Sequence, residues 1–289
     1  MKKTWFLWLS AFLITVLAAY YQRTTGPTNP KRVTVTIAET TYKLKSPRSL
    51  ITEITPQQAQ GDWKSLEKSS TLKITITKKE GVNQLTKETP IHLYFKRFRS
   101  ADEWQMVEGN LDGSQILFTL PAQPPAGKIV YYLEIAGTTV FQDAPITMRF
   151  RNDVPKAILI PHILVMFAVM LLSTFCGLLA LRSDGRWKKY AWITLATVFT
   201  GGLILGPIVQ KFAFGAFWTG WPLGDDLTDT KTLVAACFWV LALIFSKKKT
   251  GRWLAILAAI VLLIVYSIPH STAGSEFNYE TGQVETGAK

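Results

Sequence analysis

Cysteine, histidine and charged residues are all scarce in this chain, and these scarcities exclude several classes of protein. Only 18% of the 289 residues are charged, against about 25% in a typical soluble domain, which indicates contact with lipid. The two cysteines, Cys176 and Cys237, both lie in apolar runs, so no disulfide-stapled fold is predicted. The motifs G-x-S-x-G, H-E-x-x-H and C-x-x-C and the P-loop are also absent from the sequence. No motif therefore assigns a catalytic activity.

The positive charge of the chain is not arranged for binding nucleic acid. The formal net charge is +12, from 32 Lys and Arg against 20 Asp and Glu. This excess is spread over short loops and one large polar segment, and it forms no basic stripe of the kind that reads RNA or DNA. We therefore expect no nucleic-acid partner.

Five charge-free apolar runs, at 4–22, 157–181, 190–210, 232–246 and 253–269, are the strongest signal in the sequence. A helix needs about 20 apolar residues to cross a bilayer core of about 30 Å, and the two longest runs meet this length comfortably. The run at 232–246 is short, and it spans only if its flanking lysines extend toward the lipid head groups. The sequence predicts one N-terminal span and a later bundle of four.

The N-terminal segment, 1–22, has two interpretations. A basic start, an apolar core and a small residue at Ala18 have the form of a signal peptide that is cleaved after this position. The polar and aromatic residues at 20–23 instead form an interfacial stop, which favours an uncleaved signal anchor. The rest of the topology is the same in both cases.

The loop charges predict the orientation in the membrane. The basic segments at 2–3, 182–189 and 247–252 alternate along the chain with segments that are poorer in Lys and Arg. By the positive-inside rule these three segments are cytoplasmic. The large segment at 23–156 and the polar tail at 271–289 are then extracytoplasmic, and the protein is a multi-pass protein of the cytoplasmic (inner) membrane.

Residues 23–156 have the alternating pattern of β-strands. Runs such as 33–37, 72–77 and 91–95 alternate polar with β-branched or aromatic residues, and Gly, Pro, Asn and Asp clusters separate them. About seven short strands with such turns predict a β-sandwich of immunoglobulin or fibronectin-III type. The predicted fold class is thus mixed: this extracytoplasmic β-sandwich is fused to an α-helical transmembrane bundle at 157–270.

The predicted topology gathers polar side chains at the outer membrane face. His162 lies near the outer end of the second span, and His270 lies just beyond the last one. The carboxylates expected on the same face are Asp225, Asp226, Asp229 and Glu276. Imidazole and carboxylate groups suit a transition metal, and a histidine pair can also hold haem. The alternatives are that each histidine is an interfacial residue bonded to a loop carbonyl, or that the pair handles protons beside a quinol.

The stretch from Asp225 to Asp229 has a D-D-x-x-D pattern, which resembles the magnesium-holding motif of prenyl-diphosphate enzymes. No second acidic motif accompanies it. A simpler interpretation is that Asp226 or Thr228 caps the fourth span, with Asp229 in its first turn. The aromatic residues of the preceding loop, 211–231, form either an interfacial belt or a lid over the outer-face pocket.

Three hypotheses on function follow. In the first, the β-sandwich binds or assembles a membrane or extracytoplasmic protein, and the chain is a non-catalytic subunit or accessory factor of a membrane complex, for example a respiratory one. In the second, His162 and His270 hold a metal or haem in a redox protein. In the third, Asp225, Asp226 and Asp229 serve a divalent-metal hydrolase or transferase. All three include the lipid bilayer as a partner.

Overall fold

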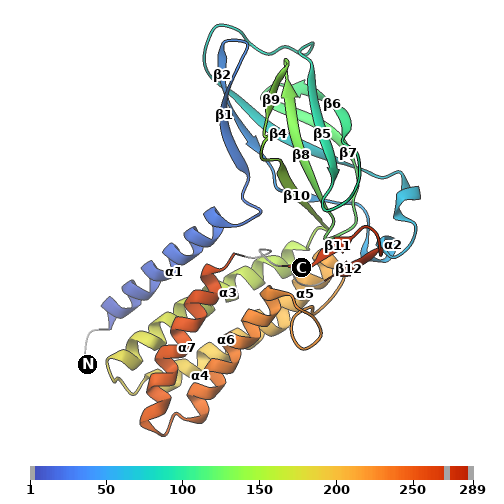
Figure 1. Cartoon of the computed structure of the whole chain (residues 1–289). Coiled ribbons are helices and arrows are strands. Elements are labelled where there is room, and N and C mark those ends of the chain that lie inside the picture. Colours follow the sequence, from blue (N-terminus) through green and yellow to red (C-terminus); the bar gives the residue numbers. More distant parts are fainter. Residues whose placement is uncertain (1–3, 270–273, 286–289) are drawn as a thin grey trace.

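The computed structural model describes residues 4–269 and 274–285. A large region made mostly of β-strands stands at one end of a group of long apolar helices (Figure 1). Helix α1 (Trp5–Thr25) precedes the strands, and all other long helices follow them. After the last helix, a short hairpin of β11 (Glu276–Asn278) and β12 (Gln283–Glu285) lies beside the base of the β-rich region.

The β-rich region contains the alternating segments expected from the sequence. Its strands are β1 (Lys31–Ile37), β2 (Thr40–Ser46), β3 (Ser49–Ile51), β4 (Ser69–Glu80), β5 (Ile91–Arg97), β6 (Gln105–Asp112), β7 (Gln115–Pro121), β8 (Lys128–Ile135), β9 (Thr138–Val140) and β10 (Ile146–Arg151). Two short helical turns, α2 (Pro56–Ala59) and η1 (Trp63–Leu66), connect β3 to β4.

The strands pair along one path, β1-β2-β4-β7-β6-β5-β8-β10-β3, and β6 changes its partner half-way along. The first half of β6 pairs with β5 and its second half pairs with β7. Inward residues from both arms of this path, among them Leu72, Leu93, Phe118 and Tyr131, bury one common core. The β-rich region is thus confirmed, while its immunoglobulin or fibronectin-III identity stays a prediction.

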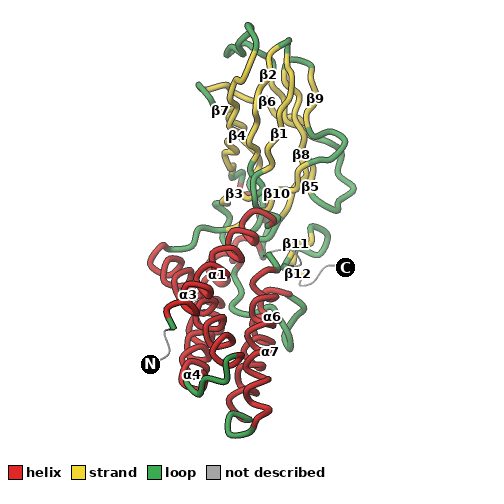
Figure 2. Tube along the Cα trace, turned by 90° about the vertical axis from the view of Figure 1, so that its left-hand side faces the viewer, coloured by secondary structure: helices red, strands yellow, loops and turns green. Residues whose placement is uncertain are grey.

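In the described part of the chain, five helical segments are long and apolar enough to cross a membrane, by length and composition. They are α1, α3 (Lys156–Leu181), the continuous segment Trp187–Phe214, α6 (Leu227–Ile244) and α7 (Lys249–Ser267). The continuous segment consists of α4 (Trp187–Val198), a π-helical stretch η2 (Phe199–Leu205) and α5 (Gly206–Phe214). Figure 2 shows these helices below the β-rich region, with their axes running away from it.

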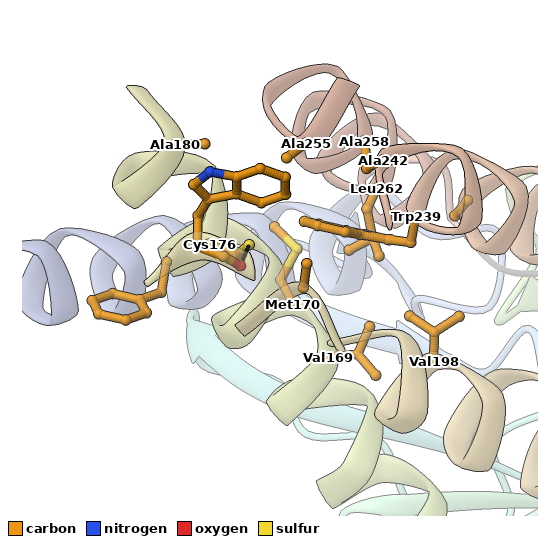
Figure 3. Close-up of a cluster of buried hydrophobic side chains, with 14 of the residues drawn as sticks. Val169, Met170, Cys176, Ala180, Val198, Trp239, Ala242, Ala255, Ala258 and Leu262 are labelled. Carbon is orange, nitrogen blue, oxygen red and sulfur yellow. Dashed lines mark hydrogen bonds between the residues drawn. The ribbon is translucent and has the colours of Figure 1, made fainter. Parts of the chain in front are cut away.

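The helices pack around large side chains that meet small ones. Trp239 of α6 is fully buried, and Figure 3 shows it in one cluster with Met170 of α3 and Ala258 of α7. Helices α3 and α7 approach each other at Gly177, where a Cβ atom would stand only 2.6 Å from the Cβ of Ala259. Small residues at such points allow close helix packing in a bilayer, where lipid supplies no hydrophobic drive between helices.

Two helix boundaries differ from those expected. The loop predicted to start at Lys211 starts instead at Gly215, because α5 continues to Phe214 and Lys211 Nζ donates a hydrogen bond to the Gly215 carbonyl. Helix α6, at the predicted fourth span, begins at Leu227 rather than at residue 232 and is 18 residues long. The charged side chains near its start, Asp229 and Lys231, have hydrogen-bond partners within the fold, so the helix can include them.

Several contacts join the β-rich region to the helices. The backbone N–H of Asn152 donates to the Ala213 carbonyl, which links the end of β10 to α5. Gly215 has a φ of 91° and lies so close to Pro56 of α2 that a Cβ would stand 2.5 Å from the proline ring. The hairpin β11–β12 adds a third link, since Phe277 N–H donates to the Ala126 carbonyl.

Candidate functional site

Three of the six residues predicted to form a site line one cavity of about 320 Å³. This junction cavity lies where β10, α3, α5 and α6 meet, and His162, Asp226 and Asp229 are part of its wall. Asp225 is exposed and Glu276 lies on β11, so neither of them lines it. His270 lies outside the described residues, and its predicted role stays a prediction.

Asp226 connects the start of α6 to the chain beyond α7. One carboxylate oxygen, Oδ1, accepts from Thr228 N–H at 2.8 Å, which confirms the expected helix N-cap. The other, Oδ2, accepts from the backbone N–H of Ser275 at 3.1 Å and from its hydroxyl at 3.0 Å. Both oxygens of this buried carboxylate are therefore engaged by donors of the protein itself.

Asp229, one turn further into α6, holds the aromatic loop. Its Oδ2 accepts from Thr219 N–H at 2.7 Å and from the Thr219 hydroxyl at 3.3 Å. The loop can approach this closely because residue 220 is glycine: a Cβ there would lie 2.5 Å from the Cβ of Asp229. Like Asp226, this carboxylate is buried and serves a structural connection.

His162 is held by the π-helical stretch. Its Nδ1 lies 3.0 Å from the Gly201 carbonyl oxygen. A carbonyl can only accept, so Nδ1 donates and, in the neutral ring, Nε2 is the acceptor. Gly201 O also receives the N–H of Gly206 five residues on, the hydrogen bond of a π-helix. Such stretches are frequent at functional sites.

Glu276 forms ion pairs with the β-rich region rather than lining the junction cavity. Its Oε2 accepts from Lys128 Nζ at 2.6 Å, and its Oε1 lies 3.9 Å from Arg99. Next to it, Tyr279 donates its hydroxyl to the Lys128 carbonyl at 3.0 Å. The predicted tail at 271–289 is thus folded against the β-rich region where it is described.

The described part of the chain contains no group of three His, Cys, Asp or Glu side chains that could hold a metal ion. Donors of the protein engage both oxygens of Asp226 and Oδ2 of Asp229. His162 has the carbonyl-bonded Nδ1 typical of metal-binding histidines, but its predicted partner His270 is not described. The metal, haem and divalent-metal hypotheses therefore stay predictions.

Two arginines in the wall of the junction cavity were missed by the sequence analysis. Arg149 of β10 is buried, its Nη2 donates to the Ser275 carbonyl at 2.6 Å, and its guanidinium lies 4.2 Å from the ring centre of Phe214. Its Nε has no hydrogen-bond partner among the described residues. Arg151, two residues along the same strand, donates to the Asn152 carbonyl at 3.1 Å.

Arg149 stays charged despite its burial. Desolvation lowers its pKa to about 10, and the negative charges of Asp226 and Glu276 partly oppose this shift. At pH 7 the guanidinium therefore carries its full charge. Within the described residues it forms no ion pair. A buried cation whose Nε has no acceptor among the described residues thus lines a cavity.

A second cavity of about 310 Å³, the helix cavity, lies between α1, α3, α6 and α7. Its wall is mainly apolar and includes Met170, Phe167 and Val265. The junction cavity and the helix cavity have the following wall residues in common: Leu159, His162, Met166, Val209 and Thr232. The two cavities are therefore neighbours, with His162 at their common boundary.

The aromatic loop between α5 and α6 is exposed at its tip. Phe217, Trp221 and Leu223 all present large apolar surfaces, while Trp218 Nε1 donates to the Trp221 carbonyl at 3.1 Å. The middle of the loop is tied to α6 by Thr219, which donates to Asp229, and by Trp221 N–H, which donates to the Thr230 hydroxyl at 3.0 Å. This arrangement is consistent with the interfacial belt, and the lid stays a prediction.

No known protein family, curated protein or solved structure matches this chain. Its function must therefore be argued from its own residues. The signal for the arginines was present in the sequence, in Met148-Arg-Phe-Arg151, which lies shortly before the apolar run at 157–181. Strand alternation places 149 and 151 on the face opposite the core-facing Met148 and Phe150, so the sequence predicts that both arginines are exposed. In the structure, the helices and the hairpin cover that face.

Proposed function

We propose that this chain is an integral membrane protein that binds the anionic head group of a ligand in the junction cavity. One observation carries the proposal: Arg149 is buried in the cavity wall, and among the described residues it has no ion-pair partner and no acceptor for its Nε donor. Burying a charge is costly, and a bound anion would lower the cost that Asp226 and Glu276 only partly offset. Arg151 adds a second guanidinium to the same wall.

The hydrogen bonds that the two carboxylates already accept support an anion rather than a cation as ligand. Asp226 and Asp229 already accept hydrogen bonds from Thr228, Ser275 and Thr219. These carboxylates thus have donors within the protein, whereas the Nε donor of Arg149 has no acceptor among the described residues. Hydrogen bonds between an arginine and an anion contribute about 1.5–3 kcal/mol each, more than neutral ones.

The proposed membrane orientation places the cavity at the outer face. The connections α3 to α4 and α6 to α7 lie at the end of the bundle remote from the β-rich region (Figures 1 and 2). Those connections contain the basic segments 182–189 and 247–252. The positive-inside rule then puts the β-rich region, and the cavity beneath it, outside the cytoplasmic membrane.

Cysteine labelling tests this orientation. In a variant without Cys176 and Cys237, single cysteines would be placed at Ser114 and at Lys188, both exposed. A membrane-impermeant maleimide added to intact spheroplasts is expected to label Ser114→Cys, and to label Lys188→Cys only after lysis. Labelling of Lys188→Cys in intact spheroplasts would refute the proposed orientation.

Phosphate binding tests the anion site itself. Inorganic phosphate, compared with chloride at equal ionic strength, is expected to raise the unfolding temperature of the detergent-solubilised protein, because a ligand of the native state stabilises it. The rise should persist in Arg32→Gln, which removes an exposed arginine of β1, and vanish in Arg149→Gln. Equal rises in both variants would overturn the proposal.

A second candidate function is the docking of a partner protein on the β-rich region, as the first hypothesis predicts. One outward patch favours it: Tyr94 of β5 stacks on Tyr132 of β8 at 4.8 Å, and Trp104 packs against Tyr132. Met106 of β6, opposite Tyr94, is 50% exposed. Aromatic side chains and Met are enriched where proteins bind one another.

Site-directed crosslinking tests this second function. A photoreactive amino acid at Trp104 is expected to give one defined adduct in cells, and the adduct should weaken when Tyr132→Ala disrupts the patch. The matched control is the same crosslinker at Ser114, on a different part of the region. Identical adducts from both positions, or none from Trp104, would remove the support for docking at this patch.

A further inference from the structure

The junction cavity and the helix cavity together have the form of a site for an amphiphile. We infer that the ligand is a phosphate-bearing amphiphile, with its phosphate in the junction cavity and its hydrocarbon chain in the helix cavity. This inference rests on the proposed function and names its ligand class. The two cavities, about 320 and 310 Å³, share a boundary and are each near the lower end of the range for small-molecule sites.

The polar half offers donors that suit a phosphate. These donors are the guanidinium groups of Arg149 and Arg151, which come from one strand. His162 of α3 also lines the cavity, but its Nδ1 already donates to Gly201 and its Nε2 is an acceptor, so it adds no donor. Phosphate presents several acceptor oxygens, and guanidinium groups match them with paired donors. A carboxylate has only two oxygens and would leave donors unused. The chemistry of the wall thus favours phosphate as the head group.

The apolar half is reached from the side of the bundle. Ile163 and Phe167 of α3 line the helix cavity and are 43% and 45% exposed on the bundle surface. The cavity wall therefore continues into the surface that would face lipid chains, and α1 contributes Thr15 and Ala19 to its other side. A hydrocarbon chain can enter this space from the bilayer without passing through water.

One ammonium group lines the helix cavity, and its position agrees with this assignment. Lys231 of α6 is buried, and its Nζ donates to the Ile268 carbonyl at 2.7 Å. Ile268 caps the end of α7 that lies next to the β-rich region. The charge is therefore at the head-group end of the cavity, and the remaining wall, with Met170 and Val265, stays apolar.

The test uses alkyl phosphates of increasing chain length, with methyl, hexyl and octyl phosphate as probes of the detergent-solubilised protein. Burial of each methylene raises affinity several-fold, so octyl phosphate is expected to bind at least about 100-fold more tightly than methyl phosphate. Ala19→Phe places a ring in the helix cavity. It should abolish this gain and keep the affinity for methyl phosphate.

Two further variants make the result decisive. Val16→Phe adds the same ring to the exposed face of α1 and should keep the full chain-length gain. Val265→Phe fills the cavity from α7 and should repeat the effect of Ala19→Phe, which guards against a folding defect in one variant. A gain that survives in both cavity-filling variants would overturn the placement of the chain.

The remaining outcomes separate the inference from the proposed function. Binding of methyl phosphate with no dependence on chain length would identify a site for free phosphate and refute the amphiphile. Loss of all phosphate binding in the wild type would refute the proposed function itself. Chain-length dependence without any effect of Arg149→Gln would place the head group elsewhere and contradict the inference.

Discussion

The hydrogen bonds of Asp226 predict a specific weakness at the junction. Asp226→Asn keeps the cap on α6, because an amide oxygen accepts from Thr228 N–H as well as a carboxylate does. Its NH₂ group, however, then faces the backbone N–H of Ser275, which loses its acceptor. The substitution should therefore detach the segment around residue 275 while leaving α6 intact.

The expected magnitude follows from the two contacts at Oδ2. A hydrogen bond to a charged group contributes about 1.5–3 kcal/mol, and the Ser275 hydroxyl can turn to accept from the new amide. The net loss is then about 2 kcal/mol, which raises the population of the locally open state by roughly 30-fold. Only local opening is affected, since the bundle core near Trp239 makes no use of this contact.

Hydrogen exchange of a peptide covering 274–280 measures this effect. The amides of Ser275 and Phe277 both have acceptors in the native state and should exchange roughly 30-fold faster in Asp226→Asn. The control is Asp225→Asn, the same chemical change at the exposed neighbouring residue. Unchanged exchange in Asp226→Asn, or equal acceleration in the control, would refute the reasoning.

Two further predictions concern the β-rich region and the bundle. Arg97 donates to Asp102 and lowers the pKa of that carboxyl from 3.8 to about 2. The ionised Asp102 carboxylate therefore contributes its full stability above about pH 4, and this contribution is lost as the pH falls toward 2. The difference in unfolding temperature between wild type and Asp102→Asn should shrink over that interval. A difference that stays constant would contradict the prediction. In the bundle, Gly177→Ala would force α3 away from Ala259 and should lower the free energy of unfolding, measured with denaturant, by about 1–3 kcal/mol. The control Gly185→Ala, whose new Cβ has no atom within 4 Å, should leave it nearly unchanged. Equal effects of the two substitutions would argue against close packing at Gly177.

Local chemistry explains which parts of the fold were predictable. The cap at Asp226 depends on a residue two positions away, and the strands depend on alternation, so both can be predicted from the sequence. The end of α5 was misplaced because Lys211 ended the apolar run. Its ammonium is satisfied by the Gly215 carbonyl, a contact that becomes visible only when the loop is folded.

The site depended on contacts that are distant in sequence. Strand alternation predicts that Arg149 is exposed, and it is buried only because Phe214 and Ser275 cover it from other parts of the chain. The same folding removed Glu276 from the predicted group by pairing it with Lys128. Which carboxylates are free and which cations are unpaired follows from tertiary packing, which composition and spacing do not encode.

The most direct test of the account is native mass spectrometry of the protein released from its own membrane in a mild neutral detergent. The account predicts that the wild type and Arg32→Gln retain a phosphate-bearing lipid at a ratio near one, and that Arg149→Gln loses it. The Arg149 variant must remain folded, as judged by an unchanged elution volume. Equal retention by all three proteins, or no retained lipid in the wild type, would contradict the claim that the junction cavity binds an anionic amphiphile.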